Sequence, residues 1–129
     1  MRRAVLGALL FAAAHAGAQA QPFPDRPVRL LVTSPPGGEN DIKARTIGVK
    51  LSEYFGQQVV IDNRGGASGM IAAEIVARAP PDGYTLLAGT NSTFSVNPTL
   101  FPRVPYDTLR DFAMVSITVT TGYRNSYPL

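Results

Sequence analysis

Short apolar runs alternate along the chain with longer segments whose apolar residues recur every three or four positions. The runs are rich in β-branched residues and predict four strands, at 28–33, 59–61, 84–89 and 113–120. The helical spacing predicts three helices, at 42–55, 71–79 and about 94–100. Strands that alternate with helices indicate an α/β fold, with a mainly parallel sheet flanked by helices.

Glycine and proline mark the ends of these elements. Gly56 is predicted to end the first helix, and Pro98 makes the third helix the weakest of the three. Residues 102–111 are expected to form a proline-rich loop with one helical turn near Leu109. The apolar face of the first helix is predicted to consist of Ile47, Leu51, Tyr54 and Phe55.

The turn from Ser34 to Asp41 is the most informative stretch of the chain. Two prolines prevent the helix from starting at once, and two glycines leave the backbone bare. Asn40 or Asp41 is expected to cap the helix that follows. The free N–H groups and positive dipole end of such a helix attract anions. An ordinary strand-to-helix connection has the same features, so the turn alone does not decide between the two.

Two further turns, at 62–69 and 90–93, have the same character. Each follows a predicted strand, precedes a helix and consists largely of glycine and small polar residues. In open α/β sheets, ligands bind at the carboxyl ends of the strands. We therefore expect three loops at one edge to surround a small polar ligand with backbone N–H groups.

The N-terminal residues have the pattern of a secretory signal peptide at 1–20. Arg2 and Arg3 precede an apolar run at 4–14, which is too short to span a bilayer, and Ala18–Ala20 resembles a cleavage site. The pattern predicts a periplasmic protein. Without Arg2 and Arg3, ten basic residues face nine acidic ones, so the net charge is +1. No basic stripe remains, and nucleic acid is not expected as a partner.

The residue types that most enzymes need are missing. The chain has no cysteine, and its one histidine, His15, lies in the predicted signal peptide. Most zinc sites and every Ser-His or Cys-His catalytic arrangement are therefore excluded. Residues 65–69 match neither a P-loop nor a dinucleotide-binding motif. We predict no catalytic residue, no metal and no cofactor, although a hydrolase or nucleotide-dependent enzyme remains the rival hypothesis.

Three charged residues near the turns have competing interpretations. Asp41 is interpreted as a helix cap and Asp62 as a turn residue, rather than as a catalytic carboxylate pair. Arg64 either pairs with an acidic ligand or is an exposed arginine without a specific role.

In combination, these stretches resemble a known family. The chain is similar to the extracytoplasmic solute-binding receptors of tripartite tricarboxylate transporters, which are also called Bug receptors. The similar stretches are 23–29, 35–42 with 44–45, 51–52 with 56–57, 59–64, 66–69 with 72–73, 79 with 81–87, 97–98, 106–107 and 111–112. No single stretch is decisive, but their order and spacing are specific.

The resemblance implies a two-lobed Venus-flytrap fold that holds a small organic acid in its cleft. It implies that the first and second loops bind a carboxylate through backbone N–H groups and ordered water. The implied ligand-binding residues are Pro36, Gly37, Gly38, Asp41, Ala67, Ser68, Gly69, Thr90 and Asn91. The implied partners are the membrane subunits of a transporter, or alternatively a membrane sensor to which the ligand is presented.

Two features depart from the family. Glu39 places a negative charge beside the expected anion site, which would weaken carboxylate binding unless the side chain points away. The chain is also much shorter than family members. We expect 21–121 to form an incomplete first lobe and 122–129 to be a tail unlike the family, produced by truncation or a frameshift. Binding is then expected to be impaired, and a non-functional gene fragment is an alternative.

Overall fold

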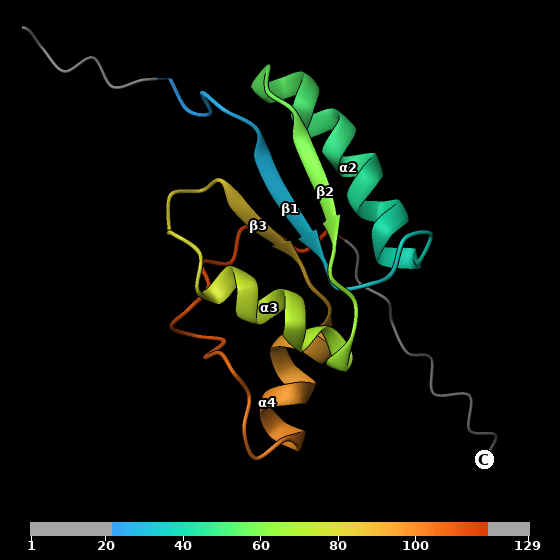
Figure 1. Cartoon of the computed structure of the whole chain (residues 1–129), viewed down its shortest axis with the longest axis vertical. Helices are drawn as coiled ribbons and strands as arrows, with labels where there is room; N and C mark the ends of the chain where they lie inside the picture. The colour runs from blue at the N-terminus through green and yellow to red at the C-terminus, as the bar shows by residue number, and fades with distance from the viewer. Residues whose placement is uncertain (1–21, 119–129) are drawn as a thin grey trace, which may run out of the picture.

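The computed structural model describes residues 22–118, so the predicted signal peptide and the 122–129 tail lie outside the described residues. The strands are β1 (Val28–Val32), β2 (Val59–Asn63) and β3 (Thr85–Ala88), and they form one parallel sheet in the order β2-β1-β3. The helical elements are α2 (Glu39–Phe55), η2 (Ala67–Gly69), α3 (Met70–Ala77), η3 (Ser92–Val96) and α4 (Asn97–Leu100). The predicted α/β architecture is confirmed (Figure 1).

The register of the sheet brings the carboxyl ends of its three strands to one edge. Val32, the last residue of β1, is level with Asn63 of β2 and Ala88 of β3. The loops that leave these residues therefore start side by side, as expected for a parallel sheet.

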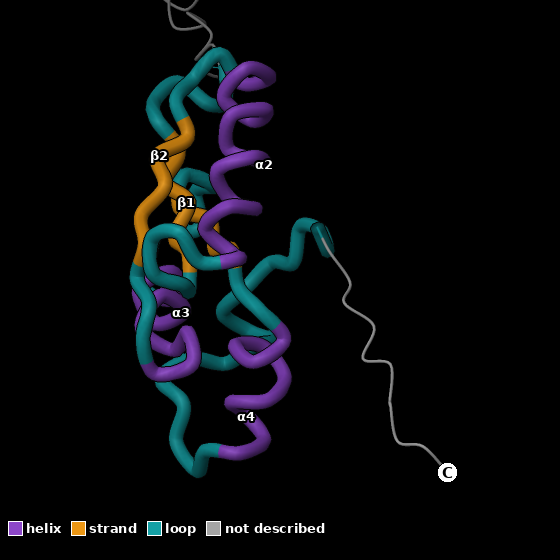
Figure 2. Tube along the Cα trace, turned by 90° about the vertical axis from the view of Figure 1, so that its right-hand side faces the viewer, coloured by secondary structure: helices purple, strands orange, loops and turns teal. Residues whose placement is uncertain are grey.

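The central strand supplies most of the core. Val28 and Val32 are fully buried and pack on the face that is covered by α2, which contributes Ala44. Leu31 is equally buried and points to the opposite face, because side chains alternate along a strand. There α3 contacts both β1 and β3. Figure 2 shows α2 running alongside β1 and β2, with α3 and α4 below them in the view.

Helix α2 begins three residues earlier than predicted. Its N-cap is Gly38, which makes no side-chain capping bond, so the assignment of the cap to Asn40 or Asp41 is wrong. The predicted apolar face is also wrong at Tyr54, which is 85% exposed. The buried side of α2 instead carries Asp41, Ala44 and Gly48. Ala44 and Gly48 are small and allow α2 to approach the sheet closely. A search for large apolar residues does not detect a helix face of this kind. Gly56 ends the helix in the left-handed conformation, as predicted.

The predicted fourth strand at 113–120 does not form over its described part. Residues 113–118 have no regular structure, and Met114, Val115 and Ile117 are exposed. Residues 119 and 120 lie outside the described range. β-Propensity measures how well a side chain fits a half-buried pleated surface, and the described part of the chain offers this run no such surface.

The third helix is confirmed as η3 followed by α4, with Pro98 in the first turn of α4. The single helical turn near Leu109 is confirmed by the hydrogen bond from the Asp111 N–H to the Asp107 carbonyl. Within 22–118, every helix is too short or too polar to cross a membrane.

Candidate functional site

An open cleft of about 260 Å³ lies where the three loops meet at the carboxyl edge of the sheet. All of its lining residues are uncharged, and most carry a hydroxyl or amide group. They are Thr33, Ser34 and Asn40 from the first loop and helix, Gly66, Ser68 and Gly69 from the second loop, and Thr90 and Ser92 from the third. The three loops therefore meet at one cleft, as expected from the sequence, and their role around a ligand stays a prediction.

The structure separates the predicted binding residues into two groups. Ser68, Gly69 and Thr90 line the cleft. The others do not line it: Pro36, Gly37, Gly38, Asp41, Ala67 and Asn91. Their roles in binding stay predictions.

Five lining residues were not predicted. They are Thr33, Ser34, Asn40, Gly66 and Ser92. A signal for two of them was present, because Thr33 and Ser34 are the first polar residues after a buried parallel strand. That position faces the ligand edge of an open sheet.

Two amides of the first loop are already occupied by internal acceptors. The Gly37 N–H donates to Asp41 Oδ2 at 2.8 Å, and the Gly38 N–H donates to the Pro35 carbonyl at 3.1 Å. They are not free for a ligand in this conformation. The N–H groups of Glu39, Asn40 and Asp41 belong to the first turn of α2 and have no partner within the helix. The anion-attracting end of α2 thus starts at Glu39.

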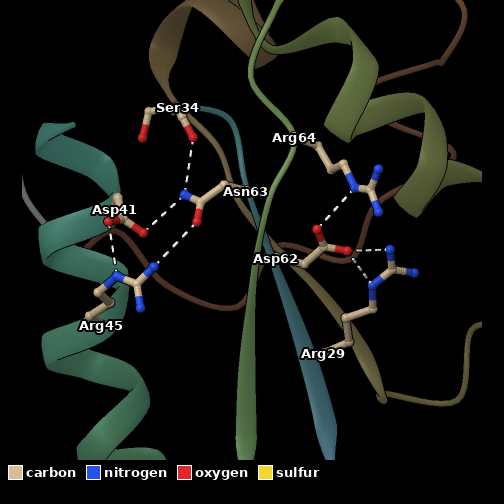
Figure 3. A network of polar contacts seen from close by, with 7 residues as sticks. All are labelled: Arg29, Ser34, Asp41, Arg45, Asp62, Asn63 and Arg64. Carbon is tan, nitrogen blue, oxygen red and sulfur yellow. Dashed lines mark hydrogen bonds and ion pairs between the residues drawn. The ribbon is translucent and has the colours of Figure 1, made fainter. Parts of the chain in front are cut away.

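Asp41 is the centre of the polar network that fixes the first loop (Figure 3). Its carboxylate is 2% exposed and accepts hydrogen bonds from Gly37, Arg45 and Asn63. The Arg45 guanidinium, followed by the Gly37 N–H and the Asn63 amide, lowers the pKa of Asp41 to about 2. The Asn63 amide also donates to the Ser34 carbonyl at 3.1 Å. Asp41 therefore ties the loop after β1 to the end of β2 and is not exposed to a ligand.

Two further arginines, Arg29 and Arg64, share a single carboxylate. Arg29 and Arg64 both donate to the Asp62 carboxylate, and Arg29 is the main cause of the lowered pKa of Asp62 (Figure 3). Arg64 therefore has an internal partner and is not without a specific contact, while its pairing with an acidic ligand stays a prediction. Asp62 lies within β2, so its interpretation as a turn residue is wrong.

The second loop contains four successive residues with positive φ. The angles are 118° at Gly66, 46° at Ala67, 53° at Ser68 and 86° at Gly69. Glycine adopts such angles freely, but for Ala67 and Ser68 the left-handed conformation costs about 1–2 kcal/mol each. Strain of this kind persists only when the surroundings enforce it, and it is concentrated at functional sites.

The buried base of the third loop and the start of α4 contact this turn. A Cβ on Gly69 would lie 2.6 Å from Thr93 Oγ1, so this turn and η3 are in close contact. The side-chain amide of Asn97 donates to the Ser68 carbonyl at 3.0 Å. Thr93 and Asn97 are both fully buried, although they lie near a surface cleft.

Hydroxyl and amide groups also link the first and third loops. The Asn40 amide donates to Thr33 Oγ1, and the Thr33 hydroxyl donates to the Ala88 carbonyl at 3.3 Å. Thr90 Oγ1 lies 3.3 Å from Thr93 Oγ1. The lining of the cleft is thereby connected from one loop to the next.

Ser34 is the exception in this set of satisfied groups. Its Oγ is buried and has no hydrogen-bond partner within the described residues. A buried hydroxyl without a partner is unusual in proteins, and Ser34 lines the cleft.

The electrostatics of the cleft suit an anion held by neutral donors. Glu39 does not line the cleft, and its exposed carboxylate pairs with Lys43, which lowers the pKa of Glu39. Among the described residues, no group of three or more His, Cys, Asp or Glu side chains is placed to hold a metal ion. The site can donate hydrogen bonds to a polar ligand.

Comparison with known proteins identifies the family. Residues 43–124 match the model of the tripartite tricarboxylate transporter family receptor. The chain belongs to this family. It is a family of receptors and not of enzymes, so the resemblance and the absence of catalysis predicted from the sequence are confirmed.

This chain is similar to individual proteins over most of its length. It is 46% identical over 123 residues to a protein encoded in the tcbD-tcbE intergenic region of Pseudomonas sp. (strain P51), which covers 92% of this chain and 36% of the relative. The structure of MatC from Rhodopseudomonas palustris with bound malate matches with a TM-score of 0.67 and 40% identity. That match covers 70% of this chain and 31% of MatC.

A second R. palustris structure, described with adipate, matches with a TM-score of 0.65 and 45% identity over 67% of this chain and 29% of the other. The chain therefore spans about a third of the length of the relatives that it matches.

Proposed function

We propose that this receptor captures a small organic acid in the periplasm, and that the cleft between its three loops binds a carboxylate of that acid. The observation that carries the proposal is the set of uncharged donors gathered at the carboxyl edge of the sheet. The malate and adipate in two solved relatives support a carboxylate as the ligand class.

The physical basis is charge-assisted hydrogen bonding from neutral groups. A carboxylate accepts strong hydrogen bonds from hydroxyl, amide and N–H donors, and water can bridge the longer gaps. The unpartnered Ser34 hydroxyl, the Asn40 amide and the N–H groups of the first turn of α2 are such donors. The positive end of the α2 dipole favours the negative charge further.

The biological role that follows is delivery of the ligand to the membrane subunits of a tripartite transporter. The family description of these proteins as transporter receptors supports this role. The periplasmic location rests on the same description and on the N-terminal signal pattern in the sequence.

A titration followed by NMR tests the proposal. The 129-residue chain is labelled with ¹⁵N and titrated with malate and, separately, with adipate. We expect saturable shifts of the amide signals of Ser34, Asn40, Ser68 and Thr90. Absence of shifts with both acids, or shifts confined to residues far from the cleft, would contradict the proposal.

Ser34→Ala sharpens this test, because it separates binding from folding. Removal of a hydroxyl that has no partner is expected to change the free energy of unfolding by less than about 0.5 kcal/mol. The same change removes a donor from the cleft, so the response to malate should weaken. Ser95→Ala is the matched control, since Ser95 is exposed and does not line the cleft.

A further inference from the structure

Asn97 occupies an unusual place for a polar side chain. It is the first residue of α4, yet only 1% of its surface is exposed. Its amide donates to the carbonyl oxygen of Ser68, which lies 29 residues earlier in the sequence, and it also lies 3.5 Å from the Tyr106 hydroxyl. The buried Asn97 amide therefore donates a hydrogen bond to the backbone of the strained turn in the second loop.

The acceptor of this bond belongs to Ser68, one of the two non-glycine residues with positive φ in the turn. The orientation of the Ser68 carbonyl is set by the backbone angles of Ser68, whose φ of 53° and ψ of 31° are left-handed. Rotation of Ser68 to an ordinary conformation would turn this carbonyl away from Asn97. The buried amide would then lose this acceptor and keep only the longer contact to the Tyr106 hydroxyl, which is unfavourable in the protein interior.

We propose that Asn97 is a positioning residue, which holds Ser68 in the left-handed conformation and so keeps the second loop in the shape that lines the cleft. Asn97 is not among the residues that line the cleft, so it acts only through Ser68. The effect of Asn97 on ligand binding rests on the proposed function, whereas its effect on the turn does not.

A purely structural role for Asn97 makes a different prediction. If the amide only satisfied the core, its loss would lower overall stability and leave the backbone angles of the folded turn unchanged. A residue with positive φ gives a strong NOE between its own HN and Hα, because the left-handed conformation brings these atoms close together. This signal reports the turn directly and needs no ligand.

The first variant is Asn97→Asp in the full chain. Aspartate has nearly the same shape, but its carboxylate cannot donate and would face the Ser68 carbonyl. We expect the HN–Hα NOEs of Ala67 and Ser68 to weaken. Thr99→Val is the matched control, because Thr99 lies in the same helix and its hydroxyl donates only to the Ser95 carbonyl. It should leave both NOEs unchanged.

A rescue variant separates positioning from folding. Ser68→Gly removes the Cβ that disfavours positive φ, so the turn should no longer depend on the amide. The double variant Asn97→Asp/Ser68→Gly is expected to recover the turn, seen as a wild-type NOE at Ala67. If Asn97→Asp alone fails to fold, a folded double variant supports the proposal and an unfolded double variant overturns it. Wild-type NOEs in a folded Asn97→Asp variant also overturn it.

Malate serves as the probe of the binding step. If part of the population leaves the competent conformation, the apparent affinity falls in proportion, and we expect a loss of about tenfold for Asn97→Asp. A wild-type chain that responds to neither malate nor adipate would contradict the proposed function but leave the NOE result valid. A wild-type affinity in a variant whose turn has changed would overturn the claim that Asn97 shapes the cleft.

Discussion

The loops that follow β1 and β2 meet at the same cleft but are held by different forces. The first loop is fixed by a charge: Asp41 accepts bonds from the loop, from its own helix and from β2. The second loop is fixed by neutral contacts, namely the amide of Asn97 on Ser68 and the tight approach of Gly69 to Thr93.

This difference gives the two loops different sensitivities. A loop held by a carboxylate responds to pH and to removal of the charge, since its hydrogen bonds require the ionised form. A loop held by close packing and left-handed backbone responds instead to the addition of a single methyl group. The uncharged cleft is thus lined by one loop that a charged group holds in place and by another that uncharged groups hold in place.

Gly69→Ala is expected to have the largest effect. The residue has a φ of 86°, and a Cβ there would lie 2.6 Å from Thr93 Oγ1 and 3.0 Å from Thr33 Cβ. Left-handed strain and overpacking together should lower the free energy of unfolding by about 2–5 kcal/mol. Urea denaturation followed by circular dichroism measures this change.

Gly37→Ala in the first loop is the matched control. Its φ of 79° is similar, but a Cβ there meets nothing within 4 Å. Only the left-handed strain of about 1–2 kcal/mol is expected. Equal losses for the two variants would show that the second loop is not more tightly packed than the first.

Asp41→Asn tests the charged support. The pKa of Asp41 is about 2 in the folded protein, below the ordinary 3.8, so its contribution to stability is present above the ordinary pKa and is lost as pH falls through the folded one. The variant should lose this contribution at neutral pH, with a melting temperature lower by roughly 10 °C, because three partly buried hydrogen bonds to one carboxylate are disturbed.

Thermal unfolding measured between neutral and strongly acidic pH checks the sign of this pH dependence of stability. The difference in melting temperature between wild type and Asp41→Asn should become smaller as the solution becomes acidic. Some pH dependence should remain in the variant, because Arg29 also lowers the pKa of Asp62. Glu53→Gln is the control, since Glu53 forms an exposed pair with Lys50 and should matter little. A gap that stays constant down to acid pH would refute a charged role for Asp41.

Ala67→Gly is expected to have the smallest effect, and the effect should be stabilising. Ala67 is exposed and has a φ of 46°, so the substitution removes strain without removing buried contacts. A gain of about 0.5–1 kcal/mol is expected after the entropic cost of glycine is subtracted. The control is Ala77→Gly in α3, where the same substitution should destabilise by a similar amount. A loss of stability at both positions would indicate that the turn is not strained.

The regular elements could be predicted because their signals are local. The β-branched run that became β1 and the glycine that ends α2 each carry a preference that neighbouring residues do not reverse. The prediction of a fourth strand was wrong because a local signal is not sufficient to form a strand. Met114 to Ile117 have β-prone side chains, but a strand forms only where another surface accepts them.

The candidate site could be predicted to the level of loops but not of individual groups. The position of each loop after a parallel strand predicted which loops meet at the cleft, whereas Ser68 and Thr90 were implied by the family resemblance. The sequence does not show that the Gly37 N–H already has an acceptor. This acceptor is Asp41, whose carboxylate also accepts a hydrogen bond from Asn63 of β2. Asn97 was overlooked for the same reason, since its acceptor is Ser68.

The amino-acid sequence by itself determined the order of the strands and helices up to residue 100, the edge at which their loops gather, the absence of cysteine and of any histidine after residue 15, and the family. The tertiary structure alone decided which N–H groups remain available and which residues hold the loops in shape. The physical reason is that spacing and propensity act over a few residues, whereas a hydrogen-bond partner can come from any element that packing brings within 3 Å or so.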